Sequence, residues 1–504
     1  MDLSFLVPEP QLVEMRNTVL ERPASFSVEY SLLAENVTKS FVLDLKNIAK
    51  VKINANGFPI YLILAKNKTE LEGYFLDINE NEIYIIASDE AGLYYGTQTL
   101  IQIIAMYDKK VLPICNIYDY PTYKTRSYMI DLGRASFSMP LIKRIIRILA
   151  RLKMNTLHLH LCDDELGGLK FNKLPFGKEN PTAISLKDLK ELVIYARKYH
   201  VTIIPEIECW GHAASMIYHD HSLYGAPGMW GGMSFAIGEK LFKTLEKVFD
   251  ELVPVLEKKC QIHIGLDEAQ WAIAKDVSPK EAKKYNPTYL VQRIYDILMK
   301  VGKKHKRQIK VHLWADHGGR PIPEKIKKKV VVQPWMYFED QEEKILENIS
   351  KYSGKNKTPF MMGAGMSSMH PGGHFGATSV WCKAGMSSPN VEGVTICHWE
   401  NNEIPEQLVG LFAGADYAWT PLTPFVQSKK PDLYRERIFG EVTLKMRAWQ
   451  QIFKDADHEA LVKDRGPIVV KGRYLWGKKS GKPVAPTAMI KNMRDMIGND
   501  NMDQ

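Results

Sequence analysis

The sequence predicts an α/β fold: a (β/α)₈ TIM barrel preceded by a small α+β domain and followed by a helical C-terminal extension. Three observations predict it. Between residues 124 and 420, short apolar runs alternate with amphipathic stretches, the order of a parallel barrel. Before this part, strand-like and helical patterns end at "YDYPTY" (118–123), which resembles a linker. Carboxylates and tryptophans follow the predicted barrel strands. We expect domains at 1–122, 123–420 and 421–504.

The N-terminal unit contains a predicted strand pair and a predicted helix. "EGYFLDI" and "NEIYIIAS" flank a turn at Asn79 to Asn81, and Tyr74, Leu76 and Ile78 alternate on one face. "DEAGLYYGTQTLIQIIAMYD" (89–108) has helical spacing, with Asp89 as a plausible N-cap. The unit is therefore expected to fold as a separate α+β domain.

Eight apolar runs of strand length follow, with amphipathic segments such as "MPLIKRIIRILARLK" between them. An open doubly wound sheet is the structural alternative, but it usually carries a glycine-rich turn after its first strand, and none stands here. Residues 421–504 contain helical stretches such as "DLYRERIFGEVTLKMRAWQQIFKDA". The eight predicted strands are 127–132, 155–161, 201–207, 261–266, 309–314, 330–335, 359–364 and 393–399.

Composition favours an ordinary globular enzyme. Of the 504 residues, 45% are hydrophobic and 25% are charged, and the net charge of +9 is small for this length. Basic runs such as "KIKKK" lack interleaved aromatic residues, so we expect no nucleic-acid partner. No run reaches the ~18 apolar residues of a membrane span. The six cysteines form no C-x-x-C pair and fit buried thiols, which favours the cytoplasm, or secretion if a leader was removed.

Polar and aromatic side chains recur where the predicted strands end. In a barrel these ends meet at one rim, which carries the active site. Carboxylates paired with tryptophans suit a sugar, since aromatic faces stack on a pyranose ring and carboxylates bind its hydroxyls. The residues at this rim are Asp131, Arg134, Asp163, Asp164, Glu206, Glu208, His212, Asp267, Glu268, Trp314, Trp335, Trp399 and Glu400.

Two adjacent carboxylates, Asp267 and Glu268, close the stretch "HIGLDE" (263–268). Glycoside cleavage usually needs one carboxyl as general acid and a second group that stabilises an oxocarbenium-like centre. Neighbouring like charges raise one pKa, which helps to keep a proton on the acid near neutral pH. The pair is therefore the predicted catalytic centre.

Several rim residues also have structural interpretations. Asp131 and Arg134 could form an ion pair at a strand end, and His212 could equally be structural or functional. His158 and His160 alternate with leucines, so we interpret them as hydrogen-bonded core histidines; no third ligand with suitable spacing supports a metal site. Neither a metal nor a cofactor is expected.

Five motifs in order make the chain resemble the family 20 glycoside hydrolases, the β-N-acetylhexosaminidases. The segment "EGYFLDI…LYYGTQTLIQI" resembles the small domain that precedes the barrel in that family, and the resemblance covers roughly residues 70 to 420. An ordered set of motifs is far more specific than any one of them. The motifs are "IDLGR" (130–134), "NTLHLHLCDD" (155–164), "IIPEIECWGHA" (203–213), "HIGLDE" (263–268) and "VVQPW" (331–335).

The resemblance implies a retaining exo-β-N-acetylhexosaminidase in which the acetamido oxygen of the substrate attacks C1 and forms an oxazolinium ion. It implies that Glu268 is the general acid and base and that Asp267 holds the acetamido N–H. Arg134 would bind the sugar hydroxyls O3 and O4, and Asp163 and His212 would support Glu268. Trp314, Trp335 and Trp399 would line the acetamide pocket and the sugar face.

Three positions depart from the family pattern. Leu266 stands where the family usually has glycine. "PFMMGAGMSSMH" lacks the tyrosine that usually follows strand seven, and Tyr337, two residues after Trp335, is a candidate for its role. Glu400 directly follows Trp399, whereas the family has its glutamate one position later, where Asn401 stands. These departures leave open whether GlcNAc or GalNAc is preferred.

Other functional hypotheses remain at this stage. The altered ends of strands seven and eight are compatible with a non-hydrolytic glycan-binding protein on a degenerate hydrolase barrel. A metal-dependent hydrolase is a third hypothesis. The expected partner is a glycan with a terminal N-acetylhexosamine, and a homodimer formed through the C-terminal extension is a further hypothesis. The natural glycan, its linkage and the oligomeric state are not determined by sequence.

Overall fold

The computed structural model describes residues 3–228, 232–315, 322–337, 342–354, 356–366, 375–399 and 404–422. The predicted C-terminal extension therefore lies outside the described residues from residue 423 onward, and so does the predicted substrate-binding residue Glu400.

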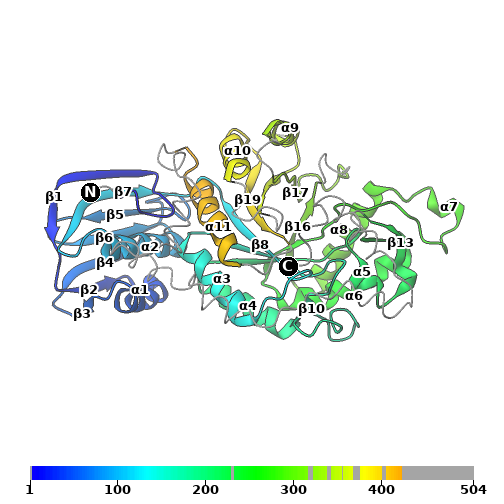
Figure 1. Cartoon of the computed structure of the whole chain (residues 1–504), viewed down its shortest axis with the longest axis horizontal. Coiled ribbons are helices and arrows are strands. Elements are labelled where there is room, and N and C mark those ends of the chain that lie inside the picture. The colour runs from blue at the N-terminus through cyan, green and yellow to red at the C-terminus, as the bar shows by residue number, and fades with distance from the viewer. Residues whose placement is uncertain are drawn as a thin grey trace, which may run out of the picture.

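The N-terminal unit is a seven-stranded mixed sheet with two helices packed on it (Figure 1). The predicted hairpin is confirmed: β5 and β6 pair antiparallel, and Asn79 Oδ1 accepts the N–H groups of Asn81 and Glu82 at the turn. The predicted N-cap is confirmed too, because Asp89 accepts the Gly92 N–H. In sheet order the strands are β1 (Leu12–Glu21), β7 (Val111–Asp119), β5 (Tyr74–Ile78), β6 (Ile83–Ala87), β4 (Phe58–Leu64), β2 (Ser25–Tyr30) and β3 (Lys52–Ile53), and the helices are α1 (Glu35–Asn47) and α2 (Glu90–Met106).

The second unit is a closed barrel of eight parallel strands that follow one another in chain order. Each predicted barrel strand is present, so the TIM barrel is confirmed and the open doubly wound sheet is excluded. The strands are β8 (Thr125–Asp131), β9 (Thr156–His160), β12 (Thr202–Glu206), β15 (Lys259–His263), β16 (Gln308–Trp314), β17 (Val330–Gln333), β18 (Phe360–Met366) and β19 (Val391–His398).

Helices surround the barrel, and local sequence explains where they start. The Ser138 side chain caps α3 by accepting the Leu141 N–H. Ser185 and Asp188 form a reciprocal capping box at the start of α4. The main helices are α3 (Met139–Arg151), α4 (Leu186–Arg197), α6 (Glu239–Leu252), α8 (Pro287–Lys304), α9 (Glu342–Tyr352), α10 (Phe375–Gly385) and α11 (Ile404–Trp419).

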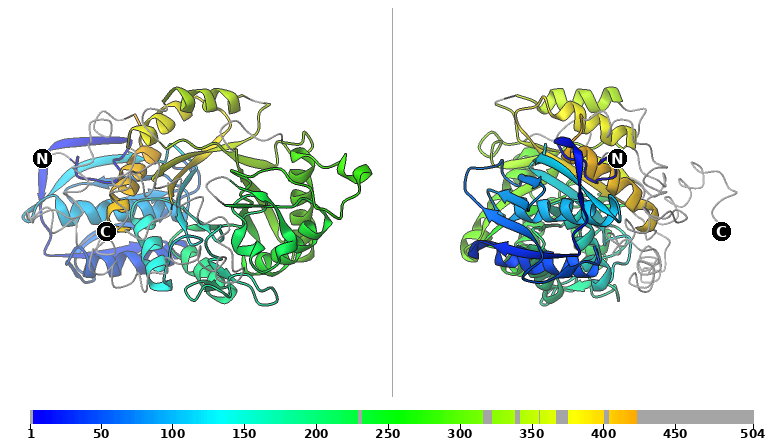
Figure 2. Two further views of the ribbon diagram at one scale, coloured as in Figure 1. Left: turned by 45° about the vertical axis from the view of Figure 1, so that its right-hand side comes forward. Right: turned by 90° about the vertical axis from the view of Figure 1, so that its left-hand side faces the viewer.

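A buried ionic cluster joins the N-terminal sheet to the barrel. Lys153 Nζ lies 2.8 Å from Asp119 Oδ2 and 2.9 Å from the Tyr74 hydroxyl, and the side chains of Lys153 and Asp119 are fully buried. Trp419 Nε1 donates to Asp119 Oδ1 at 2.7 Å, which connects α11 to the same cluster. The sheet consequently lies against one end of the barrel beside α3 and α11 (Figures 1 and 2).

The fourth barrel strand ends earlier than predicted. The sequence predicts a strand over 261–266, but β15 ends at His263 because Gly265 and Leu266 adopt positive φ angles of 62° and 83°. Such angles turn the chain out of the sheet. Asp267 and Glu268 therefore stand on a turn above the barrel rather than at the end of a regular strand.

All six cysteines are buried and unpaired, as predicted. Within the described ranges, no helix is both long and apolar enough to cross a membrane.

Candidate active site

Five of the predicted site residues meet around one imidazole at the barrel rim. His212 Nδ1 lies 3.2 Å from Asp163 Oδ1, and its Nε2 lies 3.3 Å from Glu268 Oε2 and 3.6 Å from Asp267 Oδ2. Burial alone would lower the pKa of His212, but the carboxylates of Asp163 and Asp267 outweigh burial and raise this pKa well above its usual value. A protonated imidazole therefore connects the loops that follow β9, β12 and β15.

The fifth member of this group, Arg134, lies among three carboxylates. Its guanidinium nitrogens lie 2.8 Å from Asp163 Oδ2, 3.1 Å from Asp131 Oδ2 and 3.2 Å from Glu165 Oε2. Its Cζ also lies 5.5 Å from the centre of the Trp399 ring. The ion pair with Asp131 thus forms as the structural interpretation requires, and the same guanidinium faces the aromatic side of the rim.

Asp163 is an ionised carboxylate held by two cations. Burial raises its pKa, but the charges of Arg134 and His212 overcome burial and hold the pKa well below the usual range. The neighbouring Asp164 also contacts His212, with Oδ2 3.2 Å from Nδ1, and it has a second role. Its Oδ1 accepts the N–H groups of Ala214 at 3.0 Å and Met233 at 2.9 Å. Asp164 therefore fastens the loop after β12 to the chain near β14 (Met233–Phe235).

The Asp267–Glu268 pair stands on a turn of unusual backbone geometry. Leu266 and Glu268 both have positive φ angles, 83° and 46°, a conformation that non-glycine residues seldom adopt. Asp267 is 8% exposed. Burial raises the pKa of Asp267 to about 6 although His212 opposes the rise, and the adjacent Glu268 adds to it.

Aromatic side chains gather around Tyr337 at the rim. Trp335 and Tyr337, which follow β17, stack with ring centres 5.2 Å apart, and Trp399 Nε1 donates to the Tyr337 hydroxyl at 2.9 Å. Gly365 makes room for Tyr337, since a Cβ at residue 365 would lie 2.3 Å from the ring. Trp335 and Trp399 are partly exposed, which leaves their surfaces available to a ligand.

Trp314 has a different position from the other two tryptophans. It is only 1% exposed, it packs in one cluster with Met129, Tyr337 and Cys397, and its Nε1 donates to Glu206 Oε1 at 2.5 Å. Its ring centre lies 5.7 Å from that of Trp399. Trp314 thus lies beneath the rim and supports Trp399.

A buried network below the rim was only partly anticipated. Glu206 Oε2 lies 3.0 Å from His158 Nε2 and 2.8 Å from His160 Nδ1, and Glu206 Oε1 lies 2.9 Å from His263 Nδ1. His160 Nε2 lies 2.8 Å from Asp163 Oδ2. Both histidines are buried core residues as predicted, and His160 is hydrogen-bonded through both ring nitrogens, whereas His158 meets Glu206 only in the 3.0 Å contact. The alternation of His158 and His160 with leucines indicated that both histidines face one side. It did not indicate their partner Glu206, which lies on another strand, β12.

The expectation that no third potential metal ligand stands near His158 was wrong. Glu206 and His263 do stand close enough to His158 to form a three-residue set. The Glu206 oxygens, however, are already contacted by three histidines and by Trp314. Burial raises the pKa of Glu206, but the surrounding histidines bring it well below the usual range. Glu206 is therefore an ionised carboxylate that is hydrogen-bonded to His160 Nδ1 and Trp314 Nε1.

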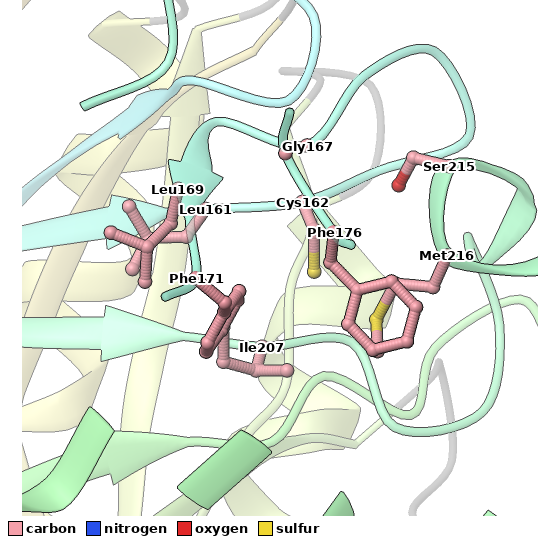
Figure 3. Close-up of a pocket in the computed structure, with 10 residues that line it drawn as sticks. Leu161, Cys162, Gly167, Leu169, Phe171, Phe176, Ile207, Ser215 and Met216 are labelled. Carbon is pink, nitrogen blue, oxygen red and sulfur yellow. The ribbon is translucent and has the colours of Figure 1, made fainter. Parts of the chain in front are cut away.

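Behind the rim, apolar side chains nearly fill the space between β9, β12 and the short helix α5 (Ala214–Ile217). Figure 3 shows the small cavity that remains, with the rings of Phe171 and Phe176 and the side chain of Met216 near Cys162. Its volume is about 10 Å³, about that of a single water probe. This region is packing that supports the loop of Asp163, and it is too small for a sugar.

Comparisons with known proteins place these observations in a family. The model "Glycosyl hydrolase family 20, catalytic domain" matches residues 123–352, and "Glycosyl hydrolase family 20, domain 2" matches residues 4–120. The chain is 26% identical to a beta-hexosaminidase of Porphyromonas gingivalis over 312 residues, which are 54% of this chain and 40% of that protein. It is 31% identical to a beta-N-acetylhexosaminidase of Cellulomonas fimi over 224 residues, 39% of this chain and 44% of that one.

Solved structures show the same fold. The exo beta-N-acetylglucosaminidase of Vibrio harveyi in complex with N-acetylglucosamine aligns with a TM-score of 0.68 at 20% identity, covering 90% of this chain and 78% of that one. The N-acetyl-beta-hexosaminidase of Streptomyces plicatus aligns with a TM-score of 0.64 at 20% identity, covering 90% and 96%. The chain spans about half the length of the curated relatives it matches.

Proposed function

The chain belongs to glycoside hydrolase family 20, and from this premise we propose that it is a retaining exo-β-N-acetylhexosaminidase that removes terminal β-linked GlcNAc or GalNAc by substrate-assisted catalysis. The observation that carries the proposal is the Asp267–Glu268 pair, in which His212 contacts both carboxylates.

In the proposed first step, Glu268 donates a proton to the glycosidic oxygen as its bond to C1 breaks. The acetamido oxygen of the substrate attacks C1 at the same time and closes an oxazolinium ring. Asp267 accepts a hydrogen bond from the acetamido N–H, which orients the amide and balances the positive charge that develops on it. The two carboxylates are adjacent because one serves the leaving group and the other serves the attacking amide.

In the second step, Glu268 accepts a proton from water, whose oxygen attacks C1 and opens the ring. Two inversions at C1 retain the β configuration. Asp163 and His212 support Glu268 through the charged contacts described above. His212 Nε2, which lies 3.3 Å from Glu268 Oε2, can donate to the carboxylate that the first step generates.

Substrate binding is assigned to the remaining rim residues. Trp335 and Trp399 would stack on the sugar and its acetamide methyl group, with Trp314 as support below them. Tyr337, whose hydroxyl already accepts from Trp399, would donate to the acetamide oxygen. Arg134 contacts three carboxylates and has five N–H donors, which is compatible with binding of the sugar hydroxyls.

The test compares three p-nitrophenyl glycosides side by side: the β-N-acetylglucosaminide, the β-N-acetylgalactosaminide and the plain β-glucoside. We expect cleavage of the acetamido sugars only, and their ratio reports the gluco or galacto preference. The variant Glu268→Gln should lower kcat by about 10²- to 10⁴-fold, the usual contribution of general acid–base catalysis. Equal cleavage of the plain glucoside would indicate an enzymic nucleophile instead.

Two controls separate the other hypotheses. Full activity in excess chelator would exclude a metal-dependent hydrolase. Tight binding of N-acetylglucosamine in calorimetry, with no turnover of any glycoside, would favour a glycan-binding protein on a degenerate barrel.

A further inference from the structure

Glu208 is a fully buried carboxyl that the proposed chemistry does not use. It follows β12, and its backbone N–H lies 3.3 Å from Cys162 Sγ at the end of β9. From there its side chain reaches the turn that follows β15, where the Leu266 N–H donates to Glu208 Oε2 at 3.2 Å. A single buried side chain thereby contacts the backbone directly before the catalytic pair.

Packing shows how closely this carboxyl fits the turn. A Cβ at Gly265 would lie 2.0 Å from Glu208 Oε2, so a larger residue there would displace this carboxyl, and the φ of 62° also favours glycine. The loop after β12, which carries Glu208, also carries Gly211, where a Cβ would lie 2.2 Å from the Asp267 carbonyl oxygen. The loop after β12 and the turn after β15 thus interlock backbone to backbone.

The turn needs such a support because its backbone is strained. Leu266 and Glu268 hold positive φ angles, each at an energy of about 1–3 kcal/mol that persists only where the surroundings impose it. The hydrogen bond from the Leu266 N–H is the direct polar contact between Glu208 and this strained segment.

We propose that Glu208 is a positioning residue that holds the Gly265–Glu268 turn, and through it the Asp267 and Glu268 carboxylates, in the reactive arrangement. The expected effect of this role on kcat rests on the proposed function. Glu208 does not touch the reacting atoms; it acts through the backbone of Leu266.

The charge state of Glu208 is compatible with this role. Burial raises its pKa well above the usual range, and the negative charges of Asp267 and Glu206 raise it further, while His160 and His212 oppose the rise. Cys162 and Cys209, which also surround it, have raised thiol pKa values for the same reason of burial and remain uncharged. Burial and the neighbouring carboxylates thus favour the uncharged form of Glu208, which does not repel Asp267.

The test compares Glu208→Gln with Glu208→Met. Glutamine keeps an uncharged oxygen acceptor for the Leu266 N–H, whereas methionine keeps the length and volume without that acceptor. With p-nitrophenyl β-N-acetylglucosaminide, we expect E208Q to stay within a few-fold of the wild-type kcat. E208M should lose about 100-fold in kcat with little change in KM, since a misplacement of about 1 Å can have an effect of that size.

A second readout is independent of activity. Hydrogen–deuterium exchange of the segment 264–268 should be faster in E208M and unchanged in E208Q. Cys209→Ala is the matched control, because Cys209 is a neighbouring buried side chain whose Sγ bonds the Ile207 carbonyl oxygen rather than the turn. It should leave both kcat and the exchange unchanged. If E208M does not fold, Glu208→Asp replaces it, since the shorter side chain withdraws the acceptor.

Wild-type kcat and exchange in E208M would overturn the proposal. Equal losses in E208Q and E208M would overturn it too, because a hydrogen-bond acceptor would then not be what matters. If the wild type cleaves none of the glycosides, the proposed function fails, but the exchange comparison still decides whether Glu208 holds the turn.

Discussion

His212 Nε2 lies 3.3 Å from Glu268 Oε2, on an imidazole whose Nδ1 lies 3.2 Å from Asp163 Oδ1. His212 thus contacts a carboxylate whose pKa is held well below its usual range on one side and the proposed general acid on the other. Against the effect of burial in each case, Arg134 first and His212 second lower the pKa of Asp163, while the charges of Asp163 and Asp267 raise the pKa of His212.

The first prediction concerns stability against pH. The raised pKa of His212 stabilises the fold fully below its unfolded value of about 6.5, and this stability is lost as pH rises through the folded pKa. Because the pKa of Asp163 is lowered, its carboxylate stabilises the fold above a pH of about 3.9. This contribution is lost as pH falls through the folded pKa. In thermal denaturation, His212→Asn should therefore lose the most free energy of unfolding relative to the wild type, about 3 kcal/mol, between about pH 4 and pH 6.5.

The exposed His221 provides the control for this measurement. His221→Asn should follow the wild-type curve across the same pH range. A destabilisation of His212→Asn that grows steadily toward alkaline pH would contradict the charged pair.

The second prediction concerns the acid side of the activity profile. Asp267 has a pKa of about 6, raised first by burial, and only its ionised form accepts the acetamido N–H while carrying a balancing charge. We expect kcat/KM for the β-N-acetylglucosaminide to rise with pH through about 6, since kcat/KM reports the free enzyme. Asp267→Asn should lower kcat/KM and remove this limb. A limb that persists unchanged in Asp267→Asn belongs to another group.

The third prediction reverses the ordinary order of two substitutions. Leu266 is fully buried at a φ of 83°. Leu266→Ala should lose about 3 kcal/mol of stability by removing buried atoms, and it keeps the strained φ. Leu266→Gly removes one more carbon but relieves about 1–2 kcal/mol of left-handed strain, so it should be the more stable of the two in chemical denaturation.

Leu313, a fully buried residue of β16 without a positive φ, is the control. There the usual order should hold, with Leu313→Gly less stable than Leu313→Ala. The same order at both positions would mean that Leu266 is unstrained.

The fourth prediction concerns the junction of the two units. Lys153 and Asp119 are fully buried and 2.8 Å apart. Lys153→Met leaves the Asp119 charge without this partner and should reduce the free energy of unfolding by about 3–5 kcal/mol. Lys300→Met removes an exposed ion pair with Glu246 and should change the free energy of unfolding by less than about 1 kcal/mol. Equal effects in urea denaturation would show that burial does not govern the junction.

The fifth prediction tests the place of Tyr337. Tyr337→Phe removes the acceptor of the Trp399 Nε1–H and the proposed donor to the acetamide. A hydrogen bond contributes about 0.5–1.5 kcal/mol, so kcat/KM for the β-N-acetylglucosaminide should fall by about 2- to 10-fold. The melting temperature and the activity of Tyr295→Phe, on the outer helix α8, serve as controls. An unchanged kcat/KM would place the acetamide elsewhere.

Most of the barrel could be predicted because its strands are buried on all sides and read as short apolar runs in order. The rim could be predicted because parallel strands all end on the same side. The turn after β15 could not, since the apolar Ile264 and Leu266 look like a continuing strand. The partners of His158 and His160 could not be found either, because Glu206 and His263 approach from neighbouring strands.

By itself the sequence determined the order of the barrel strands, the family motifs and the residues at the rim, because strand periodicity and residue type are local properties. Only the tertiary structure decided that His212 contacts both carboxylates, that Trp314 lies beneath Trp399, and that Glu208 meets the turn of Leu266. The physical reason is that these relationships depend on loop φ and ψ angles and on packing between segments far apart in the chain.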